Sequence, residues 1–291
     1  MLLGAQLRRL RESAGITRDD AGYHIRASGS KISRLELGRV SFKERDVIDL
    51  LELYGVVDSA ERDKLIQLTK EANAVPWYQK FQDVVPDWFH VYVGLEEAAQ
   101  LIRVYEVQFV PGLLQTEGYA RQIIDSYDRV EPIAPSQVTR LVRVRLRRQQ
   151  VLDRIGLKIS VVLDESVLLR RIGTDLVMYD QLQRLARECE RPNMTLQILP
   201  LDAQHTVIGE SFVLFGFEAD GDAVLQDVVS TEQMRSGFIL EGERETHLHR
   251  VAFRTLTEAA LSPADSRKLI LETAESRWSV AQADASRATA S

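Results

Sequence analysis

The sequence predicts a multidomain protein in which an all-α bundle of short helices is followed by a mixed α/β domain. Residues 2–72 place apolar side chains at helical spacing and interrupt them with glycines at short intervals. From residue 157 onward, strand-like apolar runs alternate with helical segments, the pattern of a sheet packed against helices. The chain has 291 residues, 45% of them hydrophobic, which is enough for two separate cores.

The N-terminal bundle is predicted to hold five helices. Leu3 and Leu7 lie on one face of the first helix, and Gly15 ends it. Thr17 is a good N-cap for the second helix because acidic residues follow in the first turn, and Ser28 is the N-cap candidate of the third. The later helices are expected over 18–25, from Ser28 to Leu37, over 43–54, and from Asp58 onward.

The elements of the second domain follow from the same periodicity argument. Strands are expected at 157–166, 194–200, 210–217 and 223–229. Helices are expected at 95–106, within 110–127, and at 135–155, 176–190, 243–260 and 263–274. This alternation predicts a mixed sheet with helices packed on it.

Shifts in composition predict the domain boundaries. The bundle is assigned to 1–72, and 73–92 is expected to be a linker that packs down, because its aromatic side chains need burial. The α/β domain is assigned to 93–275. The tail, 276–291, is small and polar and is expected to be disordered.

The charge is unevenly distributed along the chain. The net charge is −6, yet the first 45 residues hold ten Lys or Arg against five Asp or Glu. This basic segment on an acidic protein is either an ordinary fluctuation or a surface that faces phosphates.

The composition also excludes several classes of protein. No apolar run reaches the roughly 18–20 residues that span a bilayer, and the N-terminus does not resemble a signal peptide. Cys189 is the only cysteine, which excludes an intramolecular disulfide and a cysteine metal cluster. We therefore expect a cytoplasmic, nucleoid-associated protein that contacts no membrane and holds no metal or cofactor.

The spacing of the second and third helices is typical of a helix-turn-helix. Such a motif needs two short helices joined by a tight turn, and the second must enter the major groove of DNA. Ile32 and Leu35 form the apolar side of the third helix. Its other side presents short hydroxyls and long cations, which suit base edges and phosphates: Ser28, Ser30, Lys31, Ser33 and Arg34.

The segments LGAQLRRLRESAGIT (3–17) and SGSKISRLELGR (28–39) resemble the XRE class of phage-repressor-like helix-turn-helix regulators. The resemblance covers about residues 3–56 and implies double-stranded DNA as the partner. It implies a partly buried structural ion pair between Arg11 and Glu36. The residues that it places on DNA are Arg18, Ser28, Gly29, Ser30, Lys31, Ser33, Arg34, Arg39 and Lys43, with Arg18, Arg39 and Lys43 on phosphates.

Two positions depart from that family pattern. Gly22 stands in the second helix where the family usually has alanine, and a helical glycine costs about 0.5–1 kcal/mol. Arg26 stands in the turn, where the family usually has glycine. We interpret either change as one that weakens the reading of DNA.

The rest of the chain also resembles a known family. VPGLLQTEGYAR (110–121), LRRQQVL (146–152), LDESVLLRRIG (163–173) and ALSPADSRKLI (260–270) are similar to a domain of unknown function. That domain follows this type of helix-turn-helix in many antitoxin-like bacterial regulators. The resemblance spans about 75–275, and it implies control by a small partner protein encoded by a neighbouring gene.

No catalytic residues are predicted. Asp164 and Glu165 are expected to cap a helix, His247 and His249 diverge on a helix, and Cys189 has no base beside it. No nucleotide-binding loop or hydrolase motif occurs. The basic segment 139–154 is either a solvated helix face or a surface for DNA or for an acidic partner.

Three functions remain open. The first is a sequence-specific regulator that binds a palindromic operator as a homodimer, held together by its C-terminal domain, which also binds the partner protein or an effector. The second is an adaptor that sequesters a partner protein without binding DNA. The third is an enzyme in the C-terminal domain. The sequence offers no nucleophile and base that would support this third function.

Overall fold

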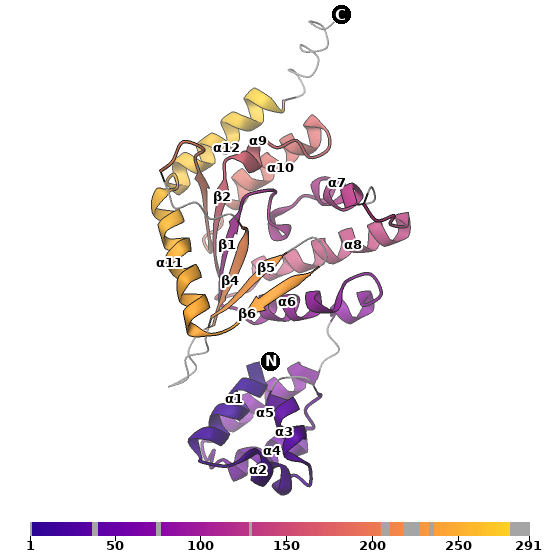
Figure 1. Ribbon diagram of the computed structural model, residues 1–291, viewed down its shortest axis with the longest axis vertical. Coiled ribbons are helices and arrows are strands. Elements are labelled where there is room, and N and C mark those ends of the chain that lie inside the picture. The colour runs from indigo at the N-terminus through magenta and orange to yellow at the C-terminus, as the bar shows by residue number, and fades with distance from the viewer. Residues whose placement is uncertain are drawn as a thin grey trace, which may run out of the picture. The chain divides into compact units, whose positions relative to one another are not determined.

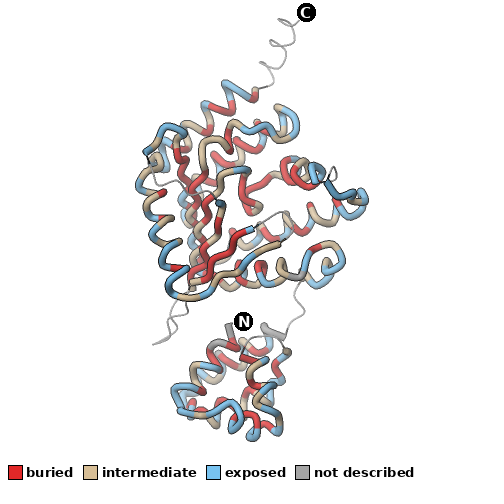
Figure 2. Tube along the Cα trace, in the orientation of Figure 1, coloured by how far each residue is buried: buried red, intermediate tan, exposed pale blue. Residues whose placement is uncertain are grey.

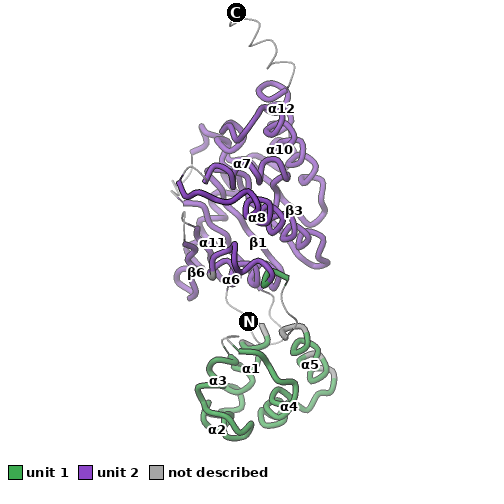
Figure 3. Tube along the Cα trace, turned by 90° about the vertical axis from the view of Figure 1, so that its right-hand side faces the viewer, with its two compact units in different colours: residues 1–79 green, residues 80–291 purple. Residues whose placement is uncertain are grey.

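The computed structural model describes residues 2–36, 40–73, 77–127, 130–204, 210–217, 227–232 and 236–279 (Figure 1). The chain divides into two compact units, residues 1–79 and residues 80–291 (Figure 3). The boundary lies inside the segment predicted as a linker. The predicted fold class, an α-helical domain followed by a mixed α/β domain, is confirmed.

The first unit is a bundle of five helices: α1 Leu2–Ser13, α2 Arg18–His24, α3 Gly29–Glu36, α4 Glu44–Leu53 and α5 Ser59–Asn73. Its core is formed by one apolar side of each of several helices, including Leu7, Ile32, Leu50 and Leu51 (Figure 2). The opposite sides face solvent, as expected for amphipathic helices around a single core.

The second unit is built on a six-stranded sheet. The strands are β1 Leu101–Glu106, β2 Lys158–Asp164, β3 Met194–Leu199, β4 Phe212–Gly216, β5 Val228–Glu232 and β6 Gly237–Leu240. They are ordered β3-β2-β1-β4-β5-β6. The first three run parallel to one another, and β4, β5 and β6 are antiparallel to their neighbours.

Helices cover both faces of this sheet (Figure 1). The helices of this unit are α6 Asp87–Ala98, α7 Glu117–Tyr127, α8 Pro135–Arg148, α9 Ser166–Leu169, α10 Asp175–Glu188, α11 Glu243–Ala259 and α12 Pro263–Arg277. On one face, Phe253 and Leu256 of α11 pack into a cluster with Tyr105 and Val229. On the other face, α6 and α8 line a cavity whose floor is formed by β1, β4 and β5.

The edge strand β3 is closed by the segment that joins α11 to α12 and by the first turn of α12. The Ile198 backbone N–H donates to Ser266 Oγ at 2.9 Å, and the Leu261 N–H donates to the Ile198 carbonyl at 2.9 Å. Because an exposed edge offers backbone groups to other chains, these bonds remove one route to unwanted strand pairing.

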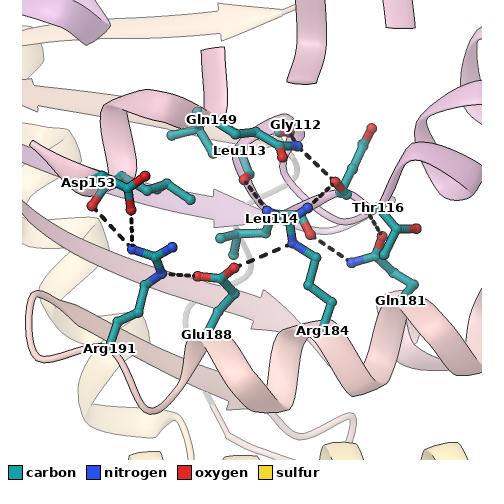
Figure 4. Close-up of polar contacts among 12 residues, drawn as sticks. Gly112, Leu113, Leu114, Thr116, Gln149, Asp153, Gln181, Arg184, Glu188 and Arg191 are labelled. Carbon is teal, nitrogen blue, oxygen red and sulfur yellow. Dashed lines mark hydrogen bonds and ion pairs between the residues drawn. The ribbon is translucent and has the colours of Figure 1, made fainter. Parts of the chain in front are cut away.

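The loop at 110–116, within the most family-specific sequence segment, is held by side chains from α8, α10 and the following 3-10 turn η3 Gln149–Asp153. Gln149 Nε2 donates to the Gly112 and Gln115 carbonyls at 3.0 and 2.8 Å, and Gln181 Nε2 donates to the Leu114 carbonyl at 2.8 Å. Arg184 also donates to the Gln115 carbonyl, at 2.8 Å, and Figure 4 shows these contacts converging on the loop. The polar side chains therefore satisfy loop carbonyls that no regular structure would pair.

Four predictions of elements or boundaries need correction. The helix expected at 95–106 is wrong, since α6 ends at Ala98 and 101–106 is strand β1, whose β-branched and aromatic residues favour a strand. The expected linker ends early, because α6 begins directly after its N-cap, Pro86. The helix expected at 135–155 ends at Arg148.

The fourth correction concerns the C-terminal boundary. Helix α12 continues to Arg277, and Trp278 is buried, with its indole Nε1 donating to the Leu168 carbonyl at 2.9 Å. The α/β unit therefore extends past 275. The rest of the expected tail, 280–291, and most of the strand expected at 223–229 lie outside the described residues.

Candidate nucleic-acid interface

Helices α2 and α3 are joined by the four residues 25–28, which is the length that a helix-turn-helix requires. Thr17 caps α2, and its side chain accepts a hydrogen bond from the Asp20 backbone N–H. The Lys31 N–H in the first turn of α3 donates to the Ser28 carbonyl at 2.9 Å and also to Ser28 Oγ at 3.3 Å. Local capping thus fixes where both helices begin.

Gly22 allows α2 and α3 to approach closely. A Cβ atom at this position would lie 2.7 Å from the Ser28 carbonyl carbon and 2.9 Å from the Gly29 nitrogen, both of which are backbone atoms. The absence of a side chain is therefore a packing requirement of the α2–α3 contact. This corrects our interpretation of Gly22 as a residue that weakens the motif.

Arg26 adopts the left-handed conformation that the turn imposes, with φ of 55°. This is the only positive φ of a non-glycine residue among the described residues. An L-residue pays about 1–2 kcal/mol in this region relative to a right-handed one. The side chain is exposed and lies in the turn directly before α3, so the arginine adds a cation beside the predicted reading helix.

Glu36, the last residue of α3, joins three helices through its carboxylate. Arg11 Nε on α1 donates to Glu36 Oε1 at 2.5 Å, and only 7% and 3% of the two side chains are exposed. Arg18 Nε on α2 donates to the other oxygen, Oε2, at 3.0 Å. The structure thus brings the Arg11–Glu36 pair together and adds Arg18 to it. Arg18 is 44% exposed, and its guanidinium is anchored by the bundle rather than extended into solvent.

Lys31 is turned toward the bundle. Its Nζ lies 2.6 Å from Asp46 Oδ2 of α4, with 29% of the lysine side chain exposed. Sequence reasoning placed Lys31 among the base-contacting residues, but this ion pair engages its charge within the domain. The contact joins α3 to α4 across fifteen positions of sequence, and no local pattern indicates it.

The N-cap of α3 and the exposed side of the helix carry four more of the predicted residues. Ser28, Ser30 and Arg34 are exposed, and Ser33 is partly exposed. Arg34 Nε donates weakly to the Ser30 carbonyl at 3.4 Å, so the arginine lies along the helix surface. Two hydroxyls and one guanidinium therefore share a solvent-facing surface on the helix that the motif places in the groove.

Gly29 has an internal role as well. A Cβ atom there would fall 2.1 Å from Asp19 Oδ1, so the missing side chain makes room for the Asp19 carboxylate at the N-terminus of α3.

Of the two residues that follow the reading helix, Lys43 is exposed immediately before α4, and Arg39 lies outside the described residues. Tyr23 of α2, which sequence reasoning did not select, is 87% exposed.

The second unit places the other chemically interesting residues in structural contacts. Asp164 Oδ1 accepts from the Ser166 N–H at 2.9 Å, and Glu165 Oε2 accepts from the Leu201 N–H at 3.0 Å. Burial raises the pKa of Cys189 to about 11, which disfavours a reactive thiolate. Among the described residues, no cluster of His, Cys, Asp or Glu has the arrangement of a metal site.

The basic segment 139–154 is largely engaged within the unit. Arg140 donates to Asp83 Oδ1 at 2.7 Å, Arg154 donates to the Glu97 carbonyl, and Arg147 donates to Gln150. Arg143 is exposed on α8. These contacts favour the interpretation of a packed, solvated helix face over a continuous cationic surface.

The comparisons with known proteins agree with the two units. A profile described as a helix-turn-helix domain matches residues 2–65. A second profile, described as a domain of unknown function (DUF5753), matches residues 89–272, more than half of the chain. No curated protein and no solved structure matches the chain. None of the described helices is both long and apolar enough to span a membrane. The chain therefore belongs to the DUF5753 family and carries that domain behind an N-terminal helix-turn-helix domain.

Proposed function

We propose that this protein is a sequence-specific DNA-binding transcription regulator of the XRE, antitoxin-like type. The observation that carries the proposal is the exposed side of α3, where Ser30 and Arg34 face solvent while Ile32 and Leu35 are buried. Hydroxyl and guanidinium groups are suited to base edges in the major groove, and the motif presents α3 to that groove.

The phosphate contacts are proposed to come from residues that flank α3. Arg26 and Lys43 are exposed on either side of the helix in sequence, and Arg18 is held by Glu36 with nearly half of its side chain exposed. Cations fixed by the fold lose less side-chain entropy on binding than free ones. Lys31 is proposed to contribute less to DNA binding than these residues, because it must break its ion pair with Asp46 before it can contact DNA.

The protein is proposed to act as a homodimer associated with the nucleoid. One helix-turn-helix reads too few bases for useful selectivity, and two related by a twofold axis read half-sites about 34 Å apart. The acidic second unit is proposed to supply the dimer contact and to receive a small partner protein or an effector. Its net negative charge favours a location away from the DNA backbone.

A footprint on the DNA upstream of the protein's own gene tests this proposal. We expect two protected major-groove segments on one side of the duplex, separated by about one helical turn. Protection that appears only at high protein concentration and without sequence preference would contradict it. A single protected segment would contradict the dimer while leaving sequence-specific binding in place.

An adaptor that sequesters a partner without binding DNA is the second candidate. The observation that favours it is that two predicted DNA contacts, Arg18 and Lys31, are paired with carboxylates inside the bundle. The same footprint separates the two functions, because an adaptor protects no DNA. A transcriptional reporter under the upstream region then measures whether binding changes expression.

A further inference from the structure

The second unit contains a cavity of about 330 Å³ between the sheet and the helices α6 and α8. Its floor is formed by β1, β4 and β5, and the loop 107–115 forms one wall. This volume lies at the lower end of the range for small-molecule pockets, about 300–1,000 Å³. Neither the helix-turn-helix nor the proposed contacts with DNA use it.

The cavity floor carries a row of polar side chains across three neighbouring strands. Val104 of β1 pairs with Val213 of β4, and Val213 pairs with Ser230 of β5. Because side chains alternate between the faces of a sheet, the positions two residues along share this face. On β1 and β5 these are Glu106 and Glu232, which also line the cavity, and Ser211 lies between them.

The opposite wall carries two arginines of α8. Arg148 is buried and forms a two-bond ion pair with Glu96 of α6, at 2.8 and 3.0 Å. Arg145 Nη1 donates to Gln115 Oε1 at 2.8 Å, which connects it to the clamped loop. Among the described residues, Arg145 forms no close ion pair of the kind that joins Arg148 to Glu96, and the negative charge of Glu232 acts on it without direct contact.

Two polar atoms of the cavity floor lack a partner within the described part of the chain. They are Glu106 Oε2 and Ser230 Oγ, and both are shielded from solvent. Buried polar atoms without a hydrogen bond are unfavourable, and a retained one points to a ligand or another unseen partner. Burial also raises the pKa of Glu106 to about 8, so the side chain holds a proton at neutral pH that a cationic group would displace.

We propose that this cavity binds a small zwitterion of amino-acid or dipeptide size, with its ammonium group on Glu106 and its carboxylate on Arg145. The floor supplies acceptors for the ammonium at Glu106 and Glu232. The α8 wall supplies a guanidinium, the group best matched to a carboxylate. Tyr92 and Val104 also line the cavity and offer surface for the apolar part of such a ligand.

The binding claim does not depend on the proposed function, whereas the role of this ligand as an effector of DNA binding rests on it. The two are distinguished by measuring binding on the full-length protein without DNA. A ligand that binds and leaves the footprint unchanged supports the site and contradicts only its effector role.

The experiment is calorimetric titration of the full-length protein with matched probes. The zwitterions are L-leucine, glycyl-L-leucine and 6-aminohexanoate, and the one-ended analogues are hexanoate and hexylamine. At least one zwitterion is expected to bind about tenfold or more tightly than both one-ended analogues. The proposal is overturned if the one-ended analogues bind equally well, or if no zwitterion binds at concentrations up to about 10 mM.

Two variants assign the ends of the ligand. Glu106→Gln is expected to weaken the best zwitterion and hexylamine about tenfold and to leave hexanoate unchanged. Arg145→Gln is expected to weaken the zwitterion and hexanoate instead. Glu245→Gln on α11 and Arg143→Gln on α8 change exposed side chains of the same types and serve as controls. If Arg145→Gln does not fold, Glu106→Gln and the probe series still decide the proposal, and equal effects of the Glu106 and Glu245 changes contradict it.

Discussion

The Arg11 guanidinium and the Glu36 carboxylate form a buried ion pair, with Arg11 Nε 2.5 Å from Glu36 Oε1. The pair joins the first helix to the end of the reading helix, and Arg11 Nη1 also donates to the Ile16 carbonyl at 2.8 Å. The hydrogen bond and the negative charge of Glu36 raise the pKa of Arg11. The Glu36 carboxylate therefore joins the C-terminal end of α3 to α1.

Glu36→Gln is predicted to destabilise the first unit by about 3–5 kcal/mol, because it leaves the buried Arg11 with the half-exposed Glu12 as its remaining carboxylate partner. Hydrogen exchange of the α1 and α3 amides measures this loss separately from the second unit. Arg8→Gln is the matched control. It breaks the Arg8–Glu12 pair, in which both side chains are 51% exposed, and should cost under about 1 kcal/mol. Similar losses of stability in the two variants would show that the buried ion pair stabilises the unit no more than the exposed one does.

Asp46→Asn is predicted to strengthen DNA binding by releasing Lys31. The two side chains are 29% and 15% exposed, so losing this ion pair should cost more than the roughly 1 kcal/mol of an exposed pair and less than the roughly 3–5 kcal/mol of a fully buried one. A freed lysine that reaches a phosphate would steepen the dependence of log affinity on log salt by about 0.9. Titrations at several salt concentrations measure the slope, and an unchanged slope would mean that Lys31 stays away from the DNA.

Arg26→Gly is predicted to have opposite effects on stability and on DNA binding. Glycine adopts the left-handed conformation of this turn without steric cost, which favours the folded state, but it also increases the entropy of the unfolded chain. The net result should be a stabilisation of the first unit by up to about 1 kcal/mol. The same change deletes an exposed cation beside α3 and should weaken binding to all sequences alike. Thermal unfolding and gel shifts measure the two effects. Unchanged affinity would place Arg26 outside the phosphate-contacting set.

The unfolding free energy of the second unit is predicted to fall as pH rises from about 4.5 to about 8, because of Glu106. Burial raises the pKa of Glu106 from 4.5 to about 8, with Glu232 raising it further and Ser211 and Arg145 opposing. Between these values the folded state binds a proton that the unfolded state has lost, so each step upward in pH favours unfolding.

Urea unfolding of wild type and Glu106→Gln across this range tests the pH prediction. The stability advantage of Glu106→Gln should grow with pH and level off above about 8, because the variant has no carboxyl to deprotonate. Glu245→Gln should show a constant difference, since that side chain is exposed. If the unfolding free energies of Glu106→Gln and wild type differ by the same amount at every pH, the pKa of Glu106 is not raised.

The helix-turn-helix was predictable because its signals are local. Thr17 and Ser28 mark helix starts, and the spacing of Ile32 and Leu35 indicates which side of α3 is buried. The pairing of Lys31 with Asp46 was not predictable, because it depends on how α3 crosses α4. Gly22 was misinterpreted for the same reason, since helix propensity does not reveal the neighbouring backbone at 2.7 Å.

The sheet was predicted less completely. Strands β2, β3 and β4 stand out as apolar runs, whereas β1 directly follows helix α6 and was absorbed into the helical pattern of Leu95–Ala99. The four-residue strand β6 is too short for a periodicity to be recognised. The row of polar side chains on the cavity floor could not be predicted from the sequence. Glu106 and Glu232 lie far apart in sequence, and only the strand order and register bring them together.

The most direct test of the central claim is the ratio of specific to non-specific DNA affinity for Arg34→Ala, compared with Lys70→Ala on α5. Arg34 is exposed on the reading helix, and Lys70 is an exposed cation outside the motif. We predict that Arg34→Ala lowers the ratio by about 5- to 160-fold, which corresponds to about 1–3 kcal/mol, and that Lys70→Ala leaves the ratio unchanged. Equal ratios in wild type and Arg34→Ala, with both proteins folded, would contradict the assignment of α3 as the helix that reads DNA.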